Sequence, residues 1–252
     1  MSKLFDLSGK VAVVTGAGRG LGQGLALGLA EAGADLALVV NRTAPEDTVR
    51  AVEALGRRAI VIQADLSAEA GAAKVSDAAI EAFGKIDILV NNAGIIRRSP
   101  AADHSYGDWQ EVLDVNLNSV FLLCQSLGRE MLKQGSGKII NIASMLTFQG
   151  GINVPGYTAS KHAVAGLTKA LANEWAGRGI NVNAIAPGYM STDNTEALRN
   201  DETRSRQILE RIPAGRWGTA QDMKGPVVFL ASSASDYMSG HVLCVDGGWM
   251  TR

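Results

Sequence analysis

The stretch TGAGRGLG, residues Thr15–Gly22, follows the apolar run Lys10–Thr15 (KVAVVT) and leads into the Leu- and Ala-rich segment Leu21–Ala32. A strand, a glycine-rich turn and a helix in this order are typical of a dinucleotide-binding unit. Glycine lets the backbone approach a phosphate, and the helix directs its positive end there. The spacing is G-x-x-x-G-x-G rather than the general G-x-G-x-x-G, so a tight turn that binds nothing is the alternative.

The same alternation of apolar runs and helical segments continues along the chain. Further strands are predicted at Asp35–Val40, Ala59–Ala64, Ile86–Val90, Lys138–Ile142, Ile180–Ala186 and Val242–Val245, and helices at Glu46–Leu55, Ala68–Phe83, Tyr106–Lys133, Tyr157–Ala176 and Gln221–Leu230. Continuously apolar strands alternating with helices predict a parallel sheet that is covered on both faces. We therefore predict one α/β domain over residues 1–252, a doubly wound parallel sheet of Rossmann type with about seven strands. The polar insert at residues 190–218 is expected to form a substrate lid.

Composition narrows the possible partners. The 252 residues include 24 basic and 25 acidic side chains, for a net charge of −1, and no basic run that would favour nucleic acid or an anionic membrane. No leader or membrane-spanning run is recognisable, so we expect a soluble cytoplasmic protein. Cys124 and Cys244 stand in apolar runs and are predicted to be buried thiols. The three histidines lack the spacing of metal ligands, so no metal site is expected.

The predicted strand ends offer groups for a nucleotide. The second strand ends in Val40-Asn41-Arg42 with no carboxylate, so NAD and NADP both remain open and Arg42 is either a 2′-phosphate ligand or a solvated loop residue. Asp65 and Leu66 end the third strand, where a carboxylate can accept a hydrogen bond from the adenine amino group. The small residues of Asn91–Gly94 (NNAG) leave room for a cofactor, although they are also common in turns.

A tyrosine and a lysine are the candidate reacting groups. Tyr157 and Lys161 are four residues apart, so they share one face of a predicted helix. A nearby ammonium group is expected to lower the pKa of a phenol, which could then exchange a proton with a carbonyl or an alcohol. Ser144 can hydrogen-bond the same oxygen, and Asn116, unfavourable inside a helix, could hold a water against Lys161.

Together these motifs identify a family. The chain resembles the short-chain dehydrogenase/reductases in the order and spacing of six motifs. These are TGAGRGLG, NNAG, Asn116, Ser144, YTASK and PG at Pro187–Gly188. The resemblance implies that Tyr157 is the acid/base, Ser144 orients the substrate carbonyl, Lys161 binds the nicotinamide ribose and Asn116 completes a proton relay. It implies NAD as cofactor, with NADP as the alternative, and a homotetramer. The cofactor contacts it implies are Gly16, Arg19, Gly20, Leu21, Gly22, Asn41, Arg42, Asp65, Leu66, Asn92, Ala93, Gly94, Tyr157, Lys161, Pro187, Gly188 and Thr192.

Segments outside the shared motifs suggest the substrate. AGIIRR, SMLTFQGG and RIPAGRWG resemble family members that act on keto-deoxy sugar acids. Arg97 and Arg98 suit a sugar-acid carboxylate, and the alternative for both is a solvated surface position. Ser144, Gln149 and Asn153 could contact the carbonyl and hydroxyl groups. Another dehydrogenase of the family, acting on gluconate or on carrier-bound 3-oxoacyl groups, and a non-catalytic dinucleotide sensor are the alternatives.

Overall fold

The computed structural model describes residues 3–252. The strands are β1 (Val11–Thr15), β2 (Asp35–Val40), β3 (Ala59–Gln63), β4 (Ile88–Asn91), β5 (Gly137–Ile142), β6 (Ile180–Pro187) and β7 (Val242–Val245). The α-helices are α1 (Gly20–Glu31), α2 (Glu46–Ala54), α3 (Glu69–Phe83), α4 (Tyr106–Leu113), α5 (Ser119–Gln134), α6 (Pro155–Trp175), α7 (Glu196–Asn200), α8 (Glu202–Arg211) and α9 (Lys224–Ala231). Within the described residues, none of these helices has the length and apolar character that a bilayer crossing requires.

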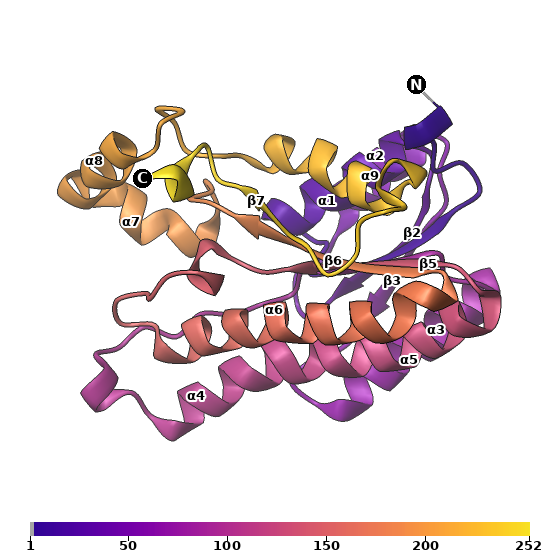
Figure 1. The fold of residues 1–252 in the computed structure, drawn as a ribbon, viewed down its shortest axis with the longest axis horizontal. Helices are drawn as coiled ribbons and strands as arrows, with labels where there is room; N and C mark the ends of the chain where they lie inside the picture. The colour runs from indigo at the N-terminus through magenta and orange to yellow at the C-terminus, as the bar shows by residue number, and fades with distance from the viewer. Residues whose placement is uncertain (1–2) are drawn as a thin grey trace.

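The strands form one sheet in the order β3-β2-β1-β4-β5-β6-β7, and every neighbouring pair is parallel. Figure 1 shows α1, α2 and α9 on one face of the sheet and α3, α5 and α6 on the other. The predicted doubly wound parallel sheet is therefore confirmed. The strand order reverses between β1 and β4, and a crevice forms at such a point, beyond the carboxyl ends of the strands.

Each face of the sheet has its own hydrophobic core. Leu29 of α1 and Val227 of α9 pack on the face that carries Val14, whereas Leu127 of α5 packs on the face that carries Val13. Adjacent residues of β1 thus serve opposite cores, as the period of two in a strand requires. Full burial of such side chains contributes roughly 1.5–3 kcal/mol each, so the two cores fix the carboxyl ends of the strands in place.

The helix predicted at Gln221–Leu230 begins only at Lys224, after a 3-10 turn at Ala220–Met223, and α1, α2 and α3 differ by one residue at one or both ends. Two further helices differ next to the site. α6 begins at Pro155, two residues early, because proline has no N–H to lose and its φ is preset for a first helical position. The long helix predicted over Tyr106–Lys133 is interrupted by a π-helical turn at Asp114–Asn118. Both differences lie beside the cavity described below.

The two thiols do not share one environment. Cys124 is buried as predicted, but Cys244 is exposed, so the prediction for Cys244 was wrong. The reason is that β7 is an edge strand whose residues lie half-covered or exposed within a single chain. An apolar run therefore does not guarantee burial at a sheet edge.

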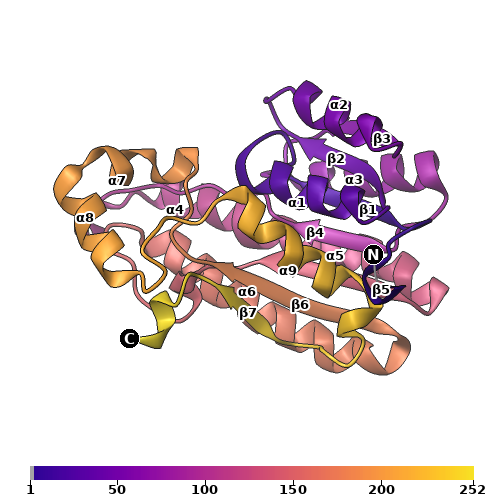
Figure 2. The ribbon, with the colours of Figure 1, turned by 90° about the horizontal axis from the view of Figure 1, so that it is seen from above.

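The insert at residues 190–218 is helical. It contains α7 and α8, which lie beyond one end of the sheet in Figure 2. Ile208 and Ile212 pack with Trp249 and with Met145, the residue after Ser144, in a small separate core. The insert is thereby packed against the loop that carries a predicted catalytic residue.

Candidate active site

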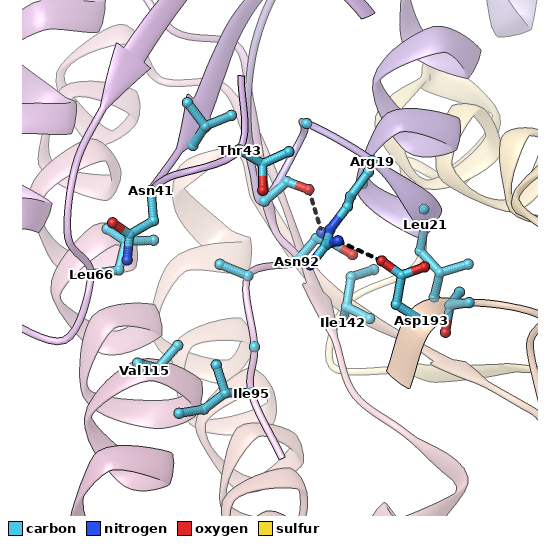
Figure 3. Close-up of a pocket in the computed structure, with 18 of the residues that line it drawn as sticks. Arg19, Leu21, Asn41, Thr43, Leu66, Asn92, Ile95, Val115, Ile142 and Asp193 are labelled. Atoms are coloured by element: carbon cyan, nitrogen blue, oxygen red, sulfur yellow. Dashed lines mark hydrogen bonds and ion pairs between the residues drawn. The ribbon is translucent and has the colours of Figure 1, made fainter. Parts of the chain in front are cut away.

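A cavity of about 490 Å³ opens where the strand order reverses, at the carboxyl ends of β1, β4 and β5 (Figure 3). Every residue expected to contact the cofactor lies on its wall, as does Ser144. The wall also contains residues that the sequence did not single out, including Thr43, Ile95, Glu111, Val115, Ile142 and Asp193. Of these residues, only Asp193 could have been predicted to line the cavity, because it is a charged residue next to Thr192 in the insert.

The glycine turn leaves space and unpaired donors at the cavity wall. Gly16 has a φ of 67°, and a Cβ on Gly22 would lie 2.0 Å from the Gly16 carbonyl oxygen, so both positions require glycine. α1 begins at Gly20, and no side chain caps it. Its first N–H groups and its positive end are therefore free for an anion. This arrangement fits the pyrophosphate of a dinucleotide.

The ends of β2 and β3 place opposite charges near each other. The Asp65 carboxylate accepts hydrogen bonds from the backbone N–H and the hydroxyl of Ser67, at 3.0 and 2.8 Å. These bonds, and to a lesser extent the charge of Arg42, hold the pKa of Asp65 below its usual value. Asp65 is therefore ionised at neutral pH, with Arg42 beside it on the cavity wall.

Asn92 braces the crevice between β1 and β4. Its Nδ2 donates to the carbonyl oxygen of Thr15 at 2.9 Å, and the Thr15 hydroxyl accepts from the backbone N–H groups of Asn92 and Ala93, both at 2.9 Å. Thr15 is fully buried and is a residue that sequence reasoning missed. The position of Thr15, directly before the first glycine of the turn, is the sequence feature from which this bracing role could have been predicted.

Three of the four predicted catalytic residues meet at the cavity. Tyr157 and Lys161 lie one turn apart on α6, and Ser144 follows β5. Ser144 hydrogen-bonds the Tyr157 hydroxyl, and its own oxygen accepts from the Leu146 N–H at 3.2 Å. Lys161 Nζ donates to the Ile142 carbonyl oxygen at 2.6 Å. The serine and the lysine are thus held by backbone groups at the end of β5 and just after it.

Burial dominates the titration of this group of residues. Desolvation raises the pKa of Tyr157, and it outweighs the hydrogen bond from Ser144 and the charge of Arg98, which act in the opposite direction. Desolvation also lowers the pKa of Lys161 to about 8. The expectation that Lys161 lowers the pKa of Tyr157 is therefore wrong for the isolated chain. A buried site disfavours the charged form of both groups, and the lysine ammonium is directed to a backbone carbonyl.

Asn116 lies in the π-helical turn, away from the cavity wall, and is fully buried. Its Oδ1 accepts from the Ile95 N–H at 2.8 Å, and its Nδ2 donates to the Ile95 carbonyl oxygen at 2.9 Å and to the Ser160 hydroxyl at 3.2 Å. The amide thereby joins the loop after β4 to α6. Turns of this kind occur often at functional sites, and this one places an asparagine where a regular helix would not favour it.

The two consecutive arginines lie in different environments. Arg97 binds Glu111 through two hydrogen bonds of 2.7 and 2.9 Å, and its Nε lies 3.6 Å from Asp108 Oδ1. Arg98 is close enough to Tyr157 for its positive charge to lower the pKa of the phenol. The Arg97 guanidinium is therefore bound to carboxylates of α4, whereas the charge of Arg98 influences the Tyr157 hydroxyl.

The other two candidates for substrate contact lie in the loop after Ser144. Gln149 Oε1 accepts from the Trp249 indole N–H at 3.0 Å. Asn153 has a φ of 62°, a left-handed conformation that asparagine tolerates, and its carbonyl oxygen accepts from the Ser99 N–H at 3.0 Å. Both residues hold the loop in shape, and their contact with substrate stays a prediction.

Similarity to known proteins covers the whole chain. The family model described as Enoyl-(Acyl carrier protein) reductase matches residues 16–250. A curated relative from Dickeya dadantii (strain 3937), named 2-dehydro-3-deoxy-D-gluconate 5-dehydrogenase, is 59% identical over 98% of both chains.

Two solved structures superpose closely on the same chain. One, from Agrobacterium tumefaciens, is provisionally described as a 2-deoxy-d-gluconate 3-dehydrogenase with bound NADP; it is 54% identical over all of both chains, with a TM-score of 0.94. The other, from Beutenbergia cavernae, is provisionally described as an NAD(P) dependent gluconate 5-dehydrogenase with NADP at low occupancy; it is 53% identical over 99% of this chain and 100% of the other, with a TM-score of 0.95. The chain belongs to the short-chain dehydrogenase/reductase family and is an NAD(P)-dependent oxidoreductase.

Proposed function

We propose that the protein transfers a hydride between NAD(P) and C5 of 2-dehydro-3-deoxy-D-gluconate, a keto-deoxy sugar acid. The observation that carries this proposal is the 59% identity, over 98% of both chains, to the relative named for that reaction. Ser144, Tyr157 and Lys161 at one cavity support it, because a phenol beside a hydroxyl donor suits proton exchange with a secondary alcohol or its ketone. The bound nicotinamide supplies or accepts the hydride.

The proton steps follow from the state of the phenol. Because burial raises the pKa of Tyr157, the neutral phenol is the resting form, ready to protonate the carbonyl oxygen in the reducing direction. Ser144 donates to the same oxygen as negative charge develops. In the oxidising direction Tyr157 must first lose its proton, so we expect oxidation to be favoured at alkaline pH. We assign Lys161 to the nicotinamide ribose and Asn116 to the proton relay.

We assign the substrate carboxylate to Arg98. Its charge already acts on Tyr157, so a carboxylate that it binds would lie near the reacting hydroxyl. A guanidinium binds a carboxylate through two parallel hydrogen bonds, which fixes orientation as well as position. Arg97 holds the neighbouring backbone through Glu111 instead. The loop residues Gln149 and Asn153 complete the assignment as candidate contacts to hydroxyl groups.

We propose that both dinucleotides bind, with Arg42 directed at the 2′-phosphate of NADP. The end of β2 has no carboxylate to accept from a ribose 2′-hydroxyl, and Arg42 is exposed on the cavity wall. The NADP molecules in the two structural neighbours support this view.

The remaining assignments concern assembly. We propose that residues 1–252 act as one dinucleotide-binding domain, with residues 190–218 as a lid over the substrate. A homotetramer is supported by exposed aromatic side chains on α4 and α5: Tyr106 is 77% exposed and Phe121 is 42% exposed. Both cysteines are free thiols, which suits the reducing cytoplasm in which we place the protein.

The experiment is a dehydrogenase assay of the purified protein at several pH values, with NAD or NADP and a panel of sugar acids. The panel contains 2-dehydro-3-deoxy-D-gluconate and gluconate, the second because the Beutenbergia relative is described as acting there. A higher kcat/KM for the keto-deoxy acid is expected. Preference for gluconate would replace the proposed substrate, and turnover of neither acid would remove the sugar-acid assignment.

A further inference from the structure

An ion pair on the cavity wall joins the glycine turn to the insert. Arg19 Nη1 lies 2.6 Å from Asp193 Oδ2, and Figure 3 shows the two side chains meeting. Both residues line the cavity in which the dinucleotide is expected to bind. We propose that Asp193 is a built-in competitor of the cofactor phosphates for Arg19, so that binding of the dinucleotide releases the insert from the glycine turn.

Arg19 stands where phosphate is expected. It is the residue immediately before α1, whose first turn begins at Gly20 without a side-chain cap. A pyrophosphate at this helix end would bring negative charge to the place where the Asp193 carboxylate now lies. Two anions cannot share one guanidinium without repulsion, so Arg19 must exchange its partner or Asp193 must withdraw.

Asp193 belongs to a segment that is held together by its own hydrogen bonds. Thr192 and Thr195 form a reciprocal cap around it, and Arg199 Nη2 donates to the Thr192 carbonyl oxygen at 3.1 Å. A Cβ on Gly20 would lie 3.9 Å from the Thr192 methyl group, so the segment rests on the glycine turn. The Arg19–Asp193 pair and this contact thus both join the insert to the start of α1.

The ion pair between Arg19 and Asp193 is weak enough for Arg19 to exchange the carboxylate for a phosphate. The Arg19 and Asp193 side chains are 69% and 65% exposed, and ion pairs this open contribute little net stability. The other carboxylates on the wall are already engaged, Asp65 with Ser67 and Glu111 with Arg97. Asp193 is thus the wall carboxylate whose partner is a cation at the expected phosphate position. The inference rests on the proposed role of the insert as a lid, and it does not depend on the sugar acid.

Calorimetric titration of NADPH and NADH tests this competition without turnover. Asp193→Asn should tighten both dinucleotides by about twofold to fivefold, the range expected for loss of one exposed ion pair. Arg19→Gln should weaken both. In the Arg19→Gln variant, adding Asp193→Asn should no longer change the affinity for either dinucleotide. Asp193 competes with the phosphates for the Arg19 guanidinium, which that variant lacks. The matched control is Glu210→Gln, which removes the equally exposed Arg206–Glu210 pair on α8 of the same insert and should leave both affinities unchanged.

Limited proteolysis of the insert gives an independent readout. Asp193→Asn without nucleotide should be cleaved within residues 190–218 faster than wild type. Weaker or unchanged dinucleotide binding in Asp193→Asn, or an equal gain with and without Arg19, would overturn the competition. If the competition fails while the wild-type enzyme still oxidises the keto-deoxy acid, the proposed function stands.

Discussion

The Lys161 ammonium lies 5.5 Å from the centroid of the Tyr157 ring and donates its hydrogen bond to the carbonyl oxygen of Ile142. The two side chains are therefore neighbours without being directly bonded, and burial acts on each of them separately. The same desolvation raises the pKa of the phenol and lowers that of the amine to about 8. Because burial affects the two groups independently, each residue has its own prediction.

Lys161 should make stability depend on pH. An amine whose pKa falls from 10.5 to about 8 on folding costs about 3 kcal/mol of stability at pH 7. Between pH 8 and 10.5 the unfolded chain binds more protons than the folded chain, so stability rises with pH in this window. Relative to Lys161→Met, the wild type should therefore gain about 3 kcal/mol between pH 7 and 10.5. Urea unfolding of the nucleotide-free proteins at several pH values measures it.

The matched control for this series is Lys169→Met, which removes an exposed lysine from the same helix. Its free energy of unfolding should stay parallel to that of the wild type across the pH range. A pH-independent difference between wild type and Lys161→Met would show that the buried amine keeps its ordinary pKa.

Tyr157 should be needed for chemistry and dispensable for nucleotide binding. Tyr157→Phe removes the proton donor and retains the ring, so we expect kcat to fall by about 10²- to 10⁴-fold, the usual contribution of a general acid or base. The dissociation constant of NADPH, measured by titration calorimetry, should change by less than about twofold. Tyr106→Phe makes the same change on an exposed residue and should leave kcat intact. Near-normal turnover in Tyr157→Phe would remove the phenol as the acid/base.

Much of the fold could be predicted because its signals are local. Continuously apolar runs, such as that ending at Thr15, fixed the strand positions, and glycines marked helix ends, as Gly84 does with its left-handed φ of 73° after α3. Every residue expected at the cofactor also lies on the cavity wall, because the carboxyl ends of parallel strands meet at one edge.

What escaped prediction depends on contacts between distant segments. The raised pKa of Tyr157 comes from desolvation in the folded chain, which no spacing of residues in the chain reveals. The exposure of Cys244 follows from the edge position of β7, a property of the whole sheet. The pair between Arg19 and Asp193 joins residues 174 positions apart along the chain (193 − 19). Each is a tertiary effect that local propensity does not contain.

Arg98 and Arg97 should respond differently to the same truncation. Arg98→Ala removes the proposed carboxylate ligand, so the KM for the sugar acid should rise by about 10- to 100-fold, the worth of a charge-assisted hydrogen bond. The KM for the nucleotide should not change. Arg97→Ala breaks the exposed pair with Glu111 and should alter the substrate KM by less than about fivefold, as for other exposed ion pairs. Steady-state kinetics on both variants decide the assignment, and equal effects would transfer it away from Arg98.

Arg42 should distinguish the two nucleotides. A 2′-phosphate is present in NADPH and absent from NADH, so Arg42→Ala should raise the KM for NADPH by about 10- to 100-fold and leave that for NADH within about twofold. The matched control is Arg50→Ala, an exposed arginine on α2 that pairs with Asp47 outside the cavity and should affect neither nucleotide. The readout is kcat/KM with each nucleotide at saturating sugar acid. An equal loss with both nucleotides would mean that Arg42 acts on a group they share, such as the adenine, and no loss would leave it a solvated residue. Because Asp65 lies beside Arg42 and is ionised, part of the guanidinium charge is already offset, so the NADPH effect should fall at the lower end of that range.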